Sequence, residues 1–343
     1  MVTADRGVAV VTIDRPAPAA GEVLLDVSYC GVCGSDLHML GAAEGCPPGH
    51  VLGHEFTGVI AELGPQTDGW AVGDRVVVDP LISCGECDPC RTGHPNLCRQ
   101  EGIDHGPGIG RQGAYAESVA VPAGMLRRLP RAVSDADGAL IEPLAVAIRA
   151  IKISGATPDE PVCVLGAGPI GMLTVATLRA RGFSRIAVVE PIPGRRAAAQ
   201  RLGVPAVAPD DAITGVRSLL HDEPPAVAID ASGDPTGAPL AIELLRPAGR
   251  LTIVGLPDDP APIDLGTVAF KELIVRGSLC SDDGDFTAAL GCIAAGRIPC
   301  HQIVTTTASL DDAPALLKDL RSGATKQVKV LLRPGERPEA LTG

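Results

Sequence analysis

The sequence is poor in aromatic side chains, which make up only 2% of its 343 residues. Any hydrophobic core must therefore be built mainly from Val, Ile, Leu and Ala, since hydrophobic residues still amount to 45%. No uninterrupted apolar run reaches about 18 residues, the length that a membrane span needs, so we expect no membrane association. Residues 1–14 lack a basic region followed by an apolar core, which argues against a signal peptide and favours a cytoplasmic protein.

Positive charge is also in short supply. The chain has 29 Lys and Arg against 41 Asp and Glu, a net charge of −12. A surface this acidic repels phosphate backbones, which argues against nucleic acid or anionic membrane as a partner. The length predicts about two domains of roughly 150 residues each.

The distribution of Gly, Pro and β-branched residues divides the chain. Short runs at residues 7–13, 22–29, 57–63 and 75–79 are separated by turn residues and predict a mostly antiparallel β domain. From residue 151, continuous apolar strands alternate with helices, which indicates parallel βαβ units. The expected strands are 162–165, 186–189, 227–230, 251–254 and 273–277. The tail mixes helical segments with a final strand at 327–332. We therefore predict a first domain at 1–150, to which 281–343 returns, and a second at 151–280.

Four of the eleven cysteines fall in one short window. They are Cys84, Cys87, Cys90 and Cys98. In a reducing compartment, cysteines at such spacing bind metal more often than they form disulfides, and four thiolates suit a closed, structural zinc site. Two disulfides and an iron–sulfur cluster are the alternatives. The remaining cysteines are spread along the chain, as small buried hydrophobic residues often are.

The loop after the expected strand 162–165 carries a complete G-x-G-x-x-G motif. Its residues are Gly166, Ala167, Gly168, Pro169, Ile170 and Gly171. In a dinucleotide-binding turn, Gly166 permits the tight turn, Gly168 lets a pyrophosphate approach the backbone, and Gly171 lets the helix lie close to the strand. The free amides of that helix would face the anion. The alternative is a glycine-rich turn with a structural role only.

Glu190 ends the next expected strand, 19 residues after Gly171. An acid at this place accepts hydrogen bonds from the adenosine ribose and repels a 2′-phosphate, which favours NAD over NADP. Arg195 and Arg196 follow closely, and either one offers a partner for that phosphate, so NADP stays an alternative. Both arginines are equally compatible with a solvated helix face.

Several motifs together resemble a known family. They are the segment 31–38 (GVCGSDLH), the triplet 53–55 (GHE), the four-cysteine window, the segment 142–145 (EPLA) and the glycine motif. In this order and spacing they are similar to the zinc-dependent medium-chain alcohol dehydrogenases. Glu142 resembles the sorbitol and threonine dehydrogenase branch. The resemblance implies an α/β plus β fold, with a GroES-like catalytic domain and a Rossmann cofactor domain whose doubly wound sheet is parallel.

The resemblance also implies a catalytic zinc ion besides the structural one. Cys33 and His54 match two of its ligands, and Glu142 or Glu55 matches the third. We favour Glu142, with Glu55 hydrogen-bonded nearby or acting as a substitute ligand. Three protein ligands leave one coordination position for water or substrate, which is typical of catalytic zinc.

Three residues close to Cys33 match other roles in the family. Ser35 and His38 match the proton relay that carries the alcohol proton to solvent. Asp36 matches a carboxylate that steadies the imidazole of His54. A turn serine, an exposed histidine and a helix-capping aspartate are the structural alternatives.

The predicted activity is hydride transfer between NAD and a secondary alcohol or polyol-like carbon. The alternatives are an NADPH-dependent ketone or aldehyde reductase of a biosynthetic pathway, and a zinc-stabilised binding protein without chemistry. A small-molecule alcohol or ketone is the expected substrate, and a homodimer or homotetramer is the expected assembly. Leu279 cannot hydrogen-bond a sugar hydroxyl, which favours a substrate less polar than sorbitol.

Overall fold

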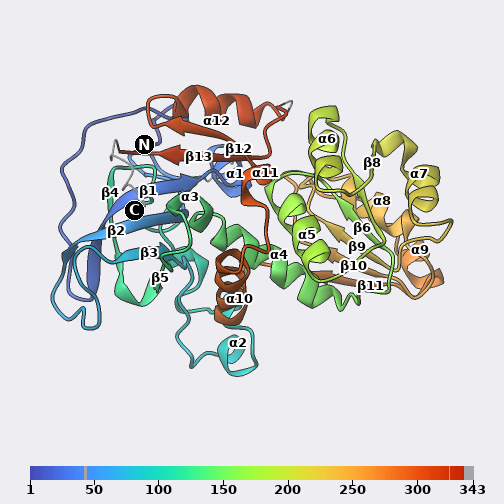
Figure 1. Cartoon of the computed structure of the whole chain (residues 1–343), viewed down its shortest axis with the longest axis horizontal. Coiled ribbons are helices and arrows are strands. Elements are labelled where there is room, and N and C mark those ends of the chain that lie inside the picture. Colours follow the sequence, from blue (N-terminus) through green and yellow to red (C-terminus); the bar gives the residue numbers. More distant parts are fainter. Residues whose placement is uncertain (42–44, 324, 336–343) are drawn as a thin grey trace. The chain divides into compact units, whose positions relative to one another are not determined.

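The structure is a computed structural model that describes residues 1–41, 45–323 and 325–335. The described residues divide into two compact units, whose elements Figure 1 labels. The first unit takes its residues from Met1–Glu142, Thr306–Gly323 and Val330–Gly343, and the second takes them from Pro143–Thr305 and Ala324–Lys329.

The first unit is built on a seven-stranded sheet. Its strands are β1 (Glu22–Gly31), β2 (Glu55–Leu63), β3 (Arg75–Val78), β4 (Ser118–Pro122), β5 (Leu126–Arg128), β12 (Val304–Ser309) and β13 (Lys329–Arg333). Their order is β12-β13-β1-β2-β3-β5, and β4 also pairs with β1. The pairs of β1 with β2, β4 and β13 are all antiparallel, which confirms the predicted mostly antiparallel domain.

The core of this sheet is almost entirely aliphatic, as the shortage of aromatics predicts. Val23 and Leu25 of β1 are fully buried and belong to one cluster with Val76 and Val78 of β3. Short helices surround the sheet. They are α1 (Gly34–Gly41), α2 (Asp88–Arg91), α3 (Asp135–Gly138) and α12 (Ala313–Arg321), with 3₁₀ turns at Pro95–Leu97, Ile103–His105 and Ala123–Met125.

The expected strand at residues 7–13 is wrong. Val8 forms only an isolated bridge with Val2. Val10, Val11 and Ile13 are each about half exposed, so this apolar run has no surface to pack against. A strand is stabilised by neighbouring strands and by burial of one face, and apolar composition alone does not supply either.

The second unit contains a six-stranded parallel sheet. Its strands are β6 (Val162–Leu165), β7 (Ile186–Val189), β8 (Ala206–Val207), β9 (Val227–Asp230), β10 (Arg250–Ile253) and β11 (Ile274–Gly277). The order β11-β10-β9-β6-β7-β8 is that of a doubly wound Rossmann sheet. Successive strands are added on one side of β6 up to β8 and on its other side from β9, so the topological switch point lies between β6 and β9. The predicted Rossmann fold is confirmed, and the crevice for a ligand is expected beyond the carboxyl end of β6.

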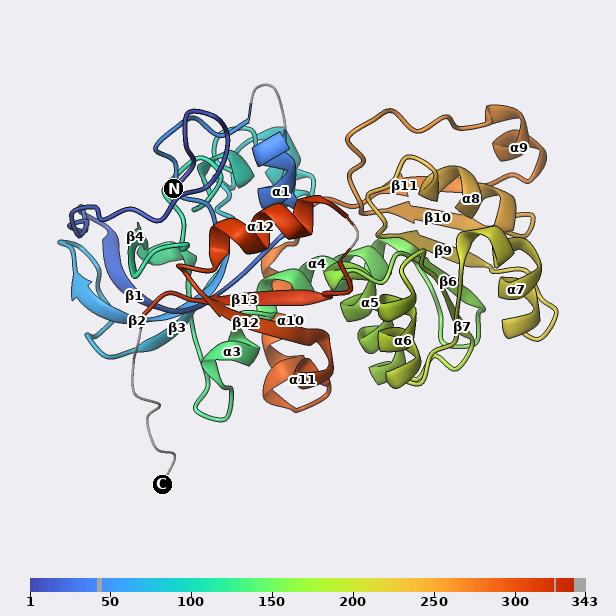
Figure 2. The ribbon, with the colours of Figure 1, turned by 90° about the horizontal axis from the view of Figure 1, so that it is seen from above.

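Helices cover both faces of this sheet (Figure 2). They are α5 (Pro169–Ala180), α6 (Pro193–Arg201), α7 (Ala212–Leu219), α8 (Gly237–Leu244) and α9 (Leu265–Phe270), with a 3₁₀ turn at Pro209–Asp211. Cys163 and Leu165 of β6 share one buried cluster with Val216 of α7 and Ile242 of α8. Strand residues on alternate positions thus face one helix layer, as a sheet buried on both faces requires.

The second unit also contains α10 (Asp283–Ala294), α11 (Cys300–Ile303) and most of α4 (Ile141–Ser154). This division differs from the predicted limits, which placed residues 281–343 with the first domain. Ion pairs explain the difference: Arg149 of α4 contacts Asp282 at 3.0 Å and Asp285 at 3.2 Å, and all three side chains are largely buried. They hold the start of α10 against α4, so the chain returns to the first unit only at Thr306.

Among the residues described, none of the helices is both long enough and apolar enough to cross a membrane.

Candidate active site and metal centres

The pairing of β1 with β2 brings the expected metal ligands together. Cys33 follows the end of β1, His54 precedes the start of β2, and Gly31 lies opposite Glu55 in the antiparallel register. The possible ligand atoms of Cys33, His54 and Glu55 lie within 4.8 Å of one another. Two motifs separated by twenty residues thus become one cluster because the sheet places their strand ends side by side.

Glu142 reaches the same site from another element. It is the second residue of α4 and is only 8% exposed. Its negative charge helps to raise the pKa of His54, so the carboxylate lies in the neighbourhood of the imidazole. Glu55 is the glutamate whose carboxylate lies within 4.8 Å of the ligand atoms of Cys33 and His54. Our preference for Glu142 as the third ligand therefore stays a prediction.

The electrostatic potential at this site is negative. Burial lowers the pKa of His54, but the charges of Cys33, Asp36 and Glu142 outweigh burial and hold that pKa well above its usual value. Since the field favours a positive charge on the imidazole, it favours a metal cation in the same place. Thiolate, imidazole and carboxylate are all ligands that zinc takes, so the donor set fits a zinc ion.

Asp36 lies next to the Nδ1 side of the His54 imidazole, and its role in steadying that ring stays a prediction. Its carboxylate is fully buried and its Oδ1 lies 3.7 Å from Nδ1 of His54. Neither of these two atoms has a hydrogen-bond partner among the described residues. The other oxygen, Oδ2, accepts hydrogen bonds from the Cys33 amide at 3.0 Å and from the Tyr115 hydroxyl at 2.6 Å.

Tyr115 is the member of this site that the sequence analysis missed. It belongs to no motif that we recognised, and one tyrosine between small residues gives no signal in a single sequence.

Ser35 and His38 lie on α1, three residues apart and therefore on one side of the helix. The Oγ of Ser35 is buried and has no hydrogen-bond partner within the described part of the chain. His38 is exposed. A buried hydroxyl followed by a solvent-accessible imidazole suits the expected proton relay, which stays a prediction.

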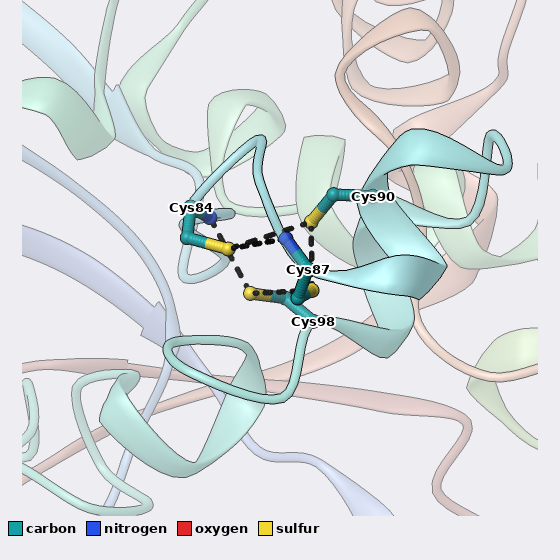
Figure 3. Close-up of side chains that lie close together, drawn as sticks. All are labelled: Cys84, Cys87, Cys90 and Cys98. Carbon is teal, nitrogen blue, oxygen red and sulfur yellow. Dashed lines mark hydrogen bonds between the residues drawn. The ribbon is translucent and has the colours of Figure 1, made fainter.

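The four-cysteine window forms a second possible metal site (Figure 3). The sulfurs of Cys84, Cys87, Cys90 and Cys98 point toward one another, within 4.8 Å. Cys87 lies 3.4 Å from Cys90 and 3.9 Å from Cys98, measured between sulfurs, and Cys84 lies 3.9 Å from Cys90.

These distances fit zinc. Four sulfurs about 2.3 Å from a central zinc are about 3.8 Å apart. None of the eleven cysteines forms a disulfide in this structure. Several iron atoms would push the sulfurs farther apart. The backbone amide of Cys84 donates to Cys98 and is the main reason why the pKa of that thiol falls to about 6, so the loop already favours a thiolate.

The glycine motif forms a tight turn at the end of β6. Gly166 has a φ of +90°, which glycine adopts without strain, and it follows β6 directly. A Cβ on Gly171 would lie 2.0 Å from the Gly166 carbonyl oxygen, so only glycine allows this helix to approach the turn. A Cβ on Gly168 would meet nothing within 4 Å, which leaves that side of the loop open for a pyrophosphate. Pro169 and Ile170 begin α5.

The carboxylate of Glu190 is buried and already accepts hydrogen bonds from the backbone. It is 2% exposed, and its two carboxylate oxygens accept hydrogen bonds from the amides of Ala167 (2.7 Å) and Ile192 (2.8 Å). The acid therefore lies against the glycine loop. Arg195 donates to the Gln327 carbonyl at 2.9 Å, and Arg196 donates to the Glu190 carbonyl at 2.8 Å. Both arginines thus support the backbone, and the cofactor roles of Glu190 and Arg195 stay predictions.

Comparison with known proteins identifies the same two domains that the fold shows. Residues 19–131 match the family described as alcohol dehydrogenase GroES-like domain, and residues 169–295 match zinc-binding dehydrogenase. A probable D-xylulose reductase A of Aspergillus fumigatus is 32% identical over 93% of this chain and 92% of its own.

Two solved structures are similar over almost the whole chain. The 2R,3R-butanediol dehydrogenase of Bacillus subtilis is 31% identical with a TM-score of 0.84, covering 96% of this chain and 97% of its own. An alcohol dehydrogenase of Escherichia coli CFT073, in complex with NADH, is 29% identical with a TM-score of 0.86 and covers 97% of each chain.

The fold and the matched families therefore define a zinc-binding dehydrogenase with a GroES-like and a Rossmann domain. The chain belongs to the zinc-dependent medium-chain alcohol dehydrogenase family, in its sorbitol-dehydrogenase-like branch.

Two cysteine substitutions distinguish the two metal sites. We expect Cys33→Ser to reduce bound zinc from about two ions per chain to about one, with little change in the unfolding temperature. Cys87→Ser should also remove one ion but lower the unfolding temperature by about 5 °C or more, because a closed site supports its loop. Metal analysis and thermal unfolding measure both effects, with Cys292→Ser as the control. The opposite pattern of stability losses would mean that the sites are assigned the wrong way round.

Proposed function

We propose that this protein is a zinc-dependent dehydrogenase that transfers a hydride between NAD and the carbinol carbon of a secondary alcohol or polyol. The single observation that carries the proposal is the cluster of half-buried Cys33 with buried His54 and Glu55, where the surrounding negative charge favours a cation. The activities named for the Aspergillus reductase and the Bacillus dehydrogenase support the substrate class.

The ions and the cofactor supply chemistry that the chain lacks. A zinc ion held by Cys33, His54 and one glutamate would act as a Lewis acid on the alcohol oxygen, and NAD would accept the hydride.

The chain's own residues would orient the substrate and remove its proton. Asp36, whose Oδ1 lies 3.7 Å from Nδ1 of His54, would orient the ring so that the opposite ring nitrogen could bind metal. The Oγ of Ser35 would accept the alcohol proton and release its own proton toward His38, whose imidazole would pass a proton to solvent. The structural zinc would be held by the four cysteines of the 84–98 loop and would take no part in turnover.

We propose NAD as the cofactor because the buried carboxylate of Glu190 lies against the glycine loop, where a 2′-phosphate would meet its charge. Gly166, Gly168 and Gly171, with Pro169 and Ile170, would form the pyrophosphate turn at the start of α5. Arg195 would lie beside it. An NADPH-dependent ketone or aldehyde reductase is the second candidate, because Arg195 and Arg196 are close to Glu190 in sequence.

The expected assembly is a homodimer or homotetramer. Strand β11 lies at the edge of the parallel sheet and is exposed along its whole length. Phe270 is 94% exposed and Ile274 is 45% exposed, which is unusual for large apolar side chains next to a sheet edge. Pairing of two β11 strands about a twofold axis would cover both.

We also propose a cytoplasmic location, since eleven cysteines without a disulfide suit a reducing compartment.

The turnover experiment uses zinc-loaded protein with a panel of secondary alcohols and polyols, NAD or NADP, and absorbance at the reduced nicotinamide band. We expect oxidation with NAD to exceed oxidation with NADP by at least about tenfold in kcat/KM, a difference of about 1.4 kcal/mol in transition-state binding. Cys33→Ser should be inactive. A reversed preference would favour the NADPH reductase, and no turnover with either cofactor would favour the binding protein without chemistry.

A pair of glycine substitutions tests the cofactor loop. Gly168→Ala should leave the unfolding temperature unchanged, because its Cβ would have open space, yet weaken NAD binding by about tenfold or more by crowding the pyrophosphate. Gly171→Ala should destabilise the protein even without cofactor, because its Cβ would collide with the Gly166 carbonyl. Calorimetric titration with NAD and thermal unfolding separate the two effects. Unchanged NAD affinity in Gly168→Ala would contradict the assigned pyrophosphate position.

A charge placed on the sheet edge tests the assembly. We expect Ile274→Asp to convert the oligomer to a 35.0 kDa monomer, because two buried carboxylates would face each other across the twofold axis. Val72→Asp is the control, since Val72 is 63% exposed and lies in the other unit. Analytical ultracentrifugation gives the masses, and an Ile274→Asp protein of wild-type mass would place the interface elsewhere.

A further inference from the structure

Tyr115 connects the two segments that carry the metal ligands. Its hydroxyl donates to Asp36 Oδ2 at 2.6 Å, and the same oxygen accepts the amide of Cys33 at 3.0 Å. Tyr115 is 7% exposed and Asp36 is fully buried, so solvent does not compete for this contact. A hydrogen bond to a carboxylate in such surroundings is short and strong.

The ring of Tyr115 packs against the residue before His54. Gly53 has a φ of +99°, and a Cβ there would lie 2.5 and 2.7 Å from two ring carbons of Tyr115. Only glycine therefore allows the ring to lie this close to the backbone that carries His54. One side chain thus contacts the His54 segment with its ring and the Asp36 carboxylate with its hydroxyl.

The orientation of the Asp36 carboxylate depends on these contacts. Two donors hold Oδ2, and this turns Oδ1 toward Nδ1 of His54, 3.7 Å away. The Tyr115 hydroxyl and the Cys33 amide are both donors, so the Oδ2 side of the carboxylate is engaged as an acceptor and the Oδ1 side is left facing His54.

We propose that Tyr115 is a positioning residue of the Cys33–His54 metal site, which acts by fixing the Asp36 carboxylate and, through it, the imidazole plane of His54. This inference rests on the proposed function only in requiring that Cys33 and His54 bind zinc. It adds the Tyr115 hydroxyl to the groups that orient the metal ligand His54 through Asp36. A phenylalanine ring would fill the same space but would not donate to Oδ2. Of the two donors, the Cys33 amide alone would then remain.

Tyr115→Phe is the direct test, because it removes one oxygen atom and keeps the ring. We expect zinc to leave the Cys33–His54 site about tenfold faster in the presence of a chromogenic chelator, the lower end of what losing a ligand's hydrogen-bond partner costs. The four-cysteine site should release its zinc at the wild-type rate, which gives an internal reference. Tyr29→Phe is the matched control, since Tyr29 is the other tyrosine of the chain and lies on β1.

Two further measurements separate positioning from general loss of structure. In protein with Co²⁺ at the Cys33–His54 site, Tyr115→Phe should shift the visible ligand-field bands, which report ligand geometry. In an Asp36→Asn background, adding Tyr115→Phe should change the release rate by less than twofold, because the residue through which Tyr115 acts is already altered. A full tenfold effect in that background would overturn the proposal.

The outcomes also distinguish this inference from the proposed function. If Cys33→Ser leaves the zinc content unchanged, the metal site itself is wrong. If Cys33→Ser removes one ion while Tyr115→Phe shows the wild-type release rate and cobalt spectrum, only the role of Tyr115 is overturned. Faster release from both zinc sites would show general destabilisation and would also overturn it.

Discussion

The negative charge around one buried imidazole is the constraint on which the candidate active site depends. His54 is held between the thiol of Cys33 and the carboxylates of Asp36 and Glu142, and their combined charge raises its pKa despite its burial. Acidic groups gathered out of solvent are costly unless a positive charge balances them. A divalent cation bound by these side chains would supply that charge. The register of β1 and β2 creates the site because it places Gly31 opposite Glu55.

The chain uses cysteine in two different electrostatic settings. At the 84–98 loop four sulfurs face one another, and backbone amides such as that of Cys84 stabilise a thiolate. A cation there satisfies every ligand and leaves no open position, so the site can only support structure. At Cys33 a single sulfur shares the site with an imidazole and a carboxylate, which leaves room for a further ligand. Structural and catalytic zinc sites thus differ in how many ligands the chain provides.

The sequence predicted the parallel sheet better than the antiparallel one. β6, β7 and β9 occupy the expected residues, since a continuous apolar run buried on both faces has few alternatives. Residues 7–13 have a similar composition but no surface to pack against, which composition cannot reveal. Local motifs predicted Cys33, His54 and the glycine turn, because their chemistry requires those residues at short spacing. Tyr115 reaches Asp36 across 79 residues, and the clamp of Arg149 on Asp285 spans 136, so only the fold shows these contacts.

The proposed cofactor role of Glu190 is compatible with its contacts to the glycine loop. Its oxygens each accept one backbone amide, from Ala167 and Ile192, and this holds the glycine turn against the end of β7. A carboxylate oxygen can accept a second hydrogen bond, so a ribose with two hydroxyl groups can be accommodated without breaking either contact. A 2′-phosphate offers no donor at neutral pH and would be repelled by the same charge. An acid whose orientation the loop has already fixed would therefore favour NAD. Arg196 donates to the carbonyl of Glu190 and is engaged with the backbone at the same turn.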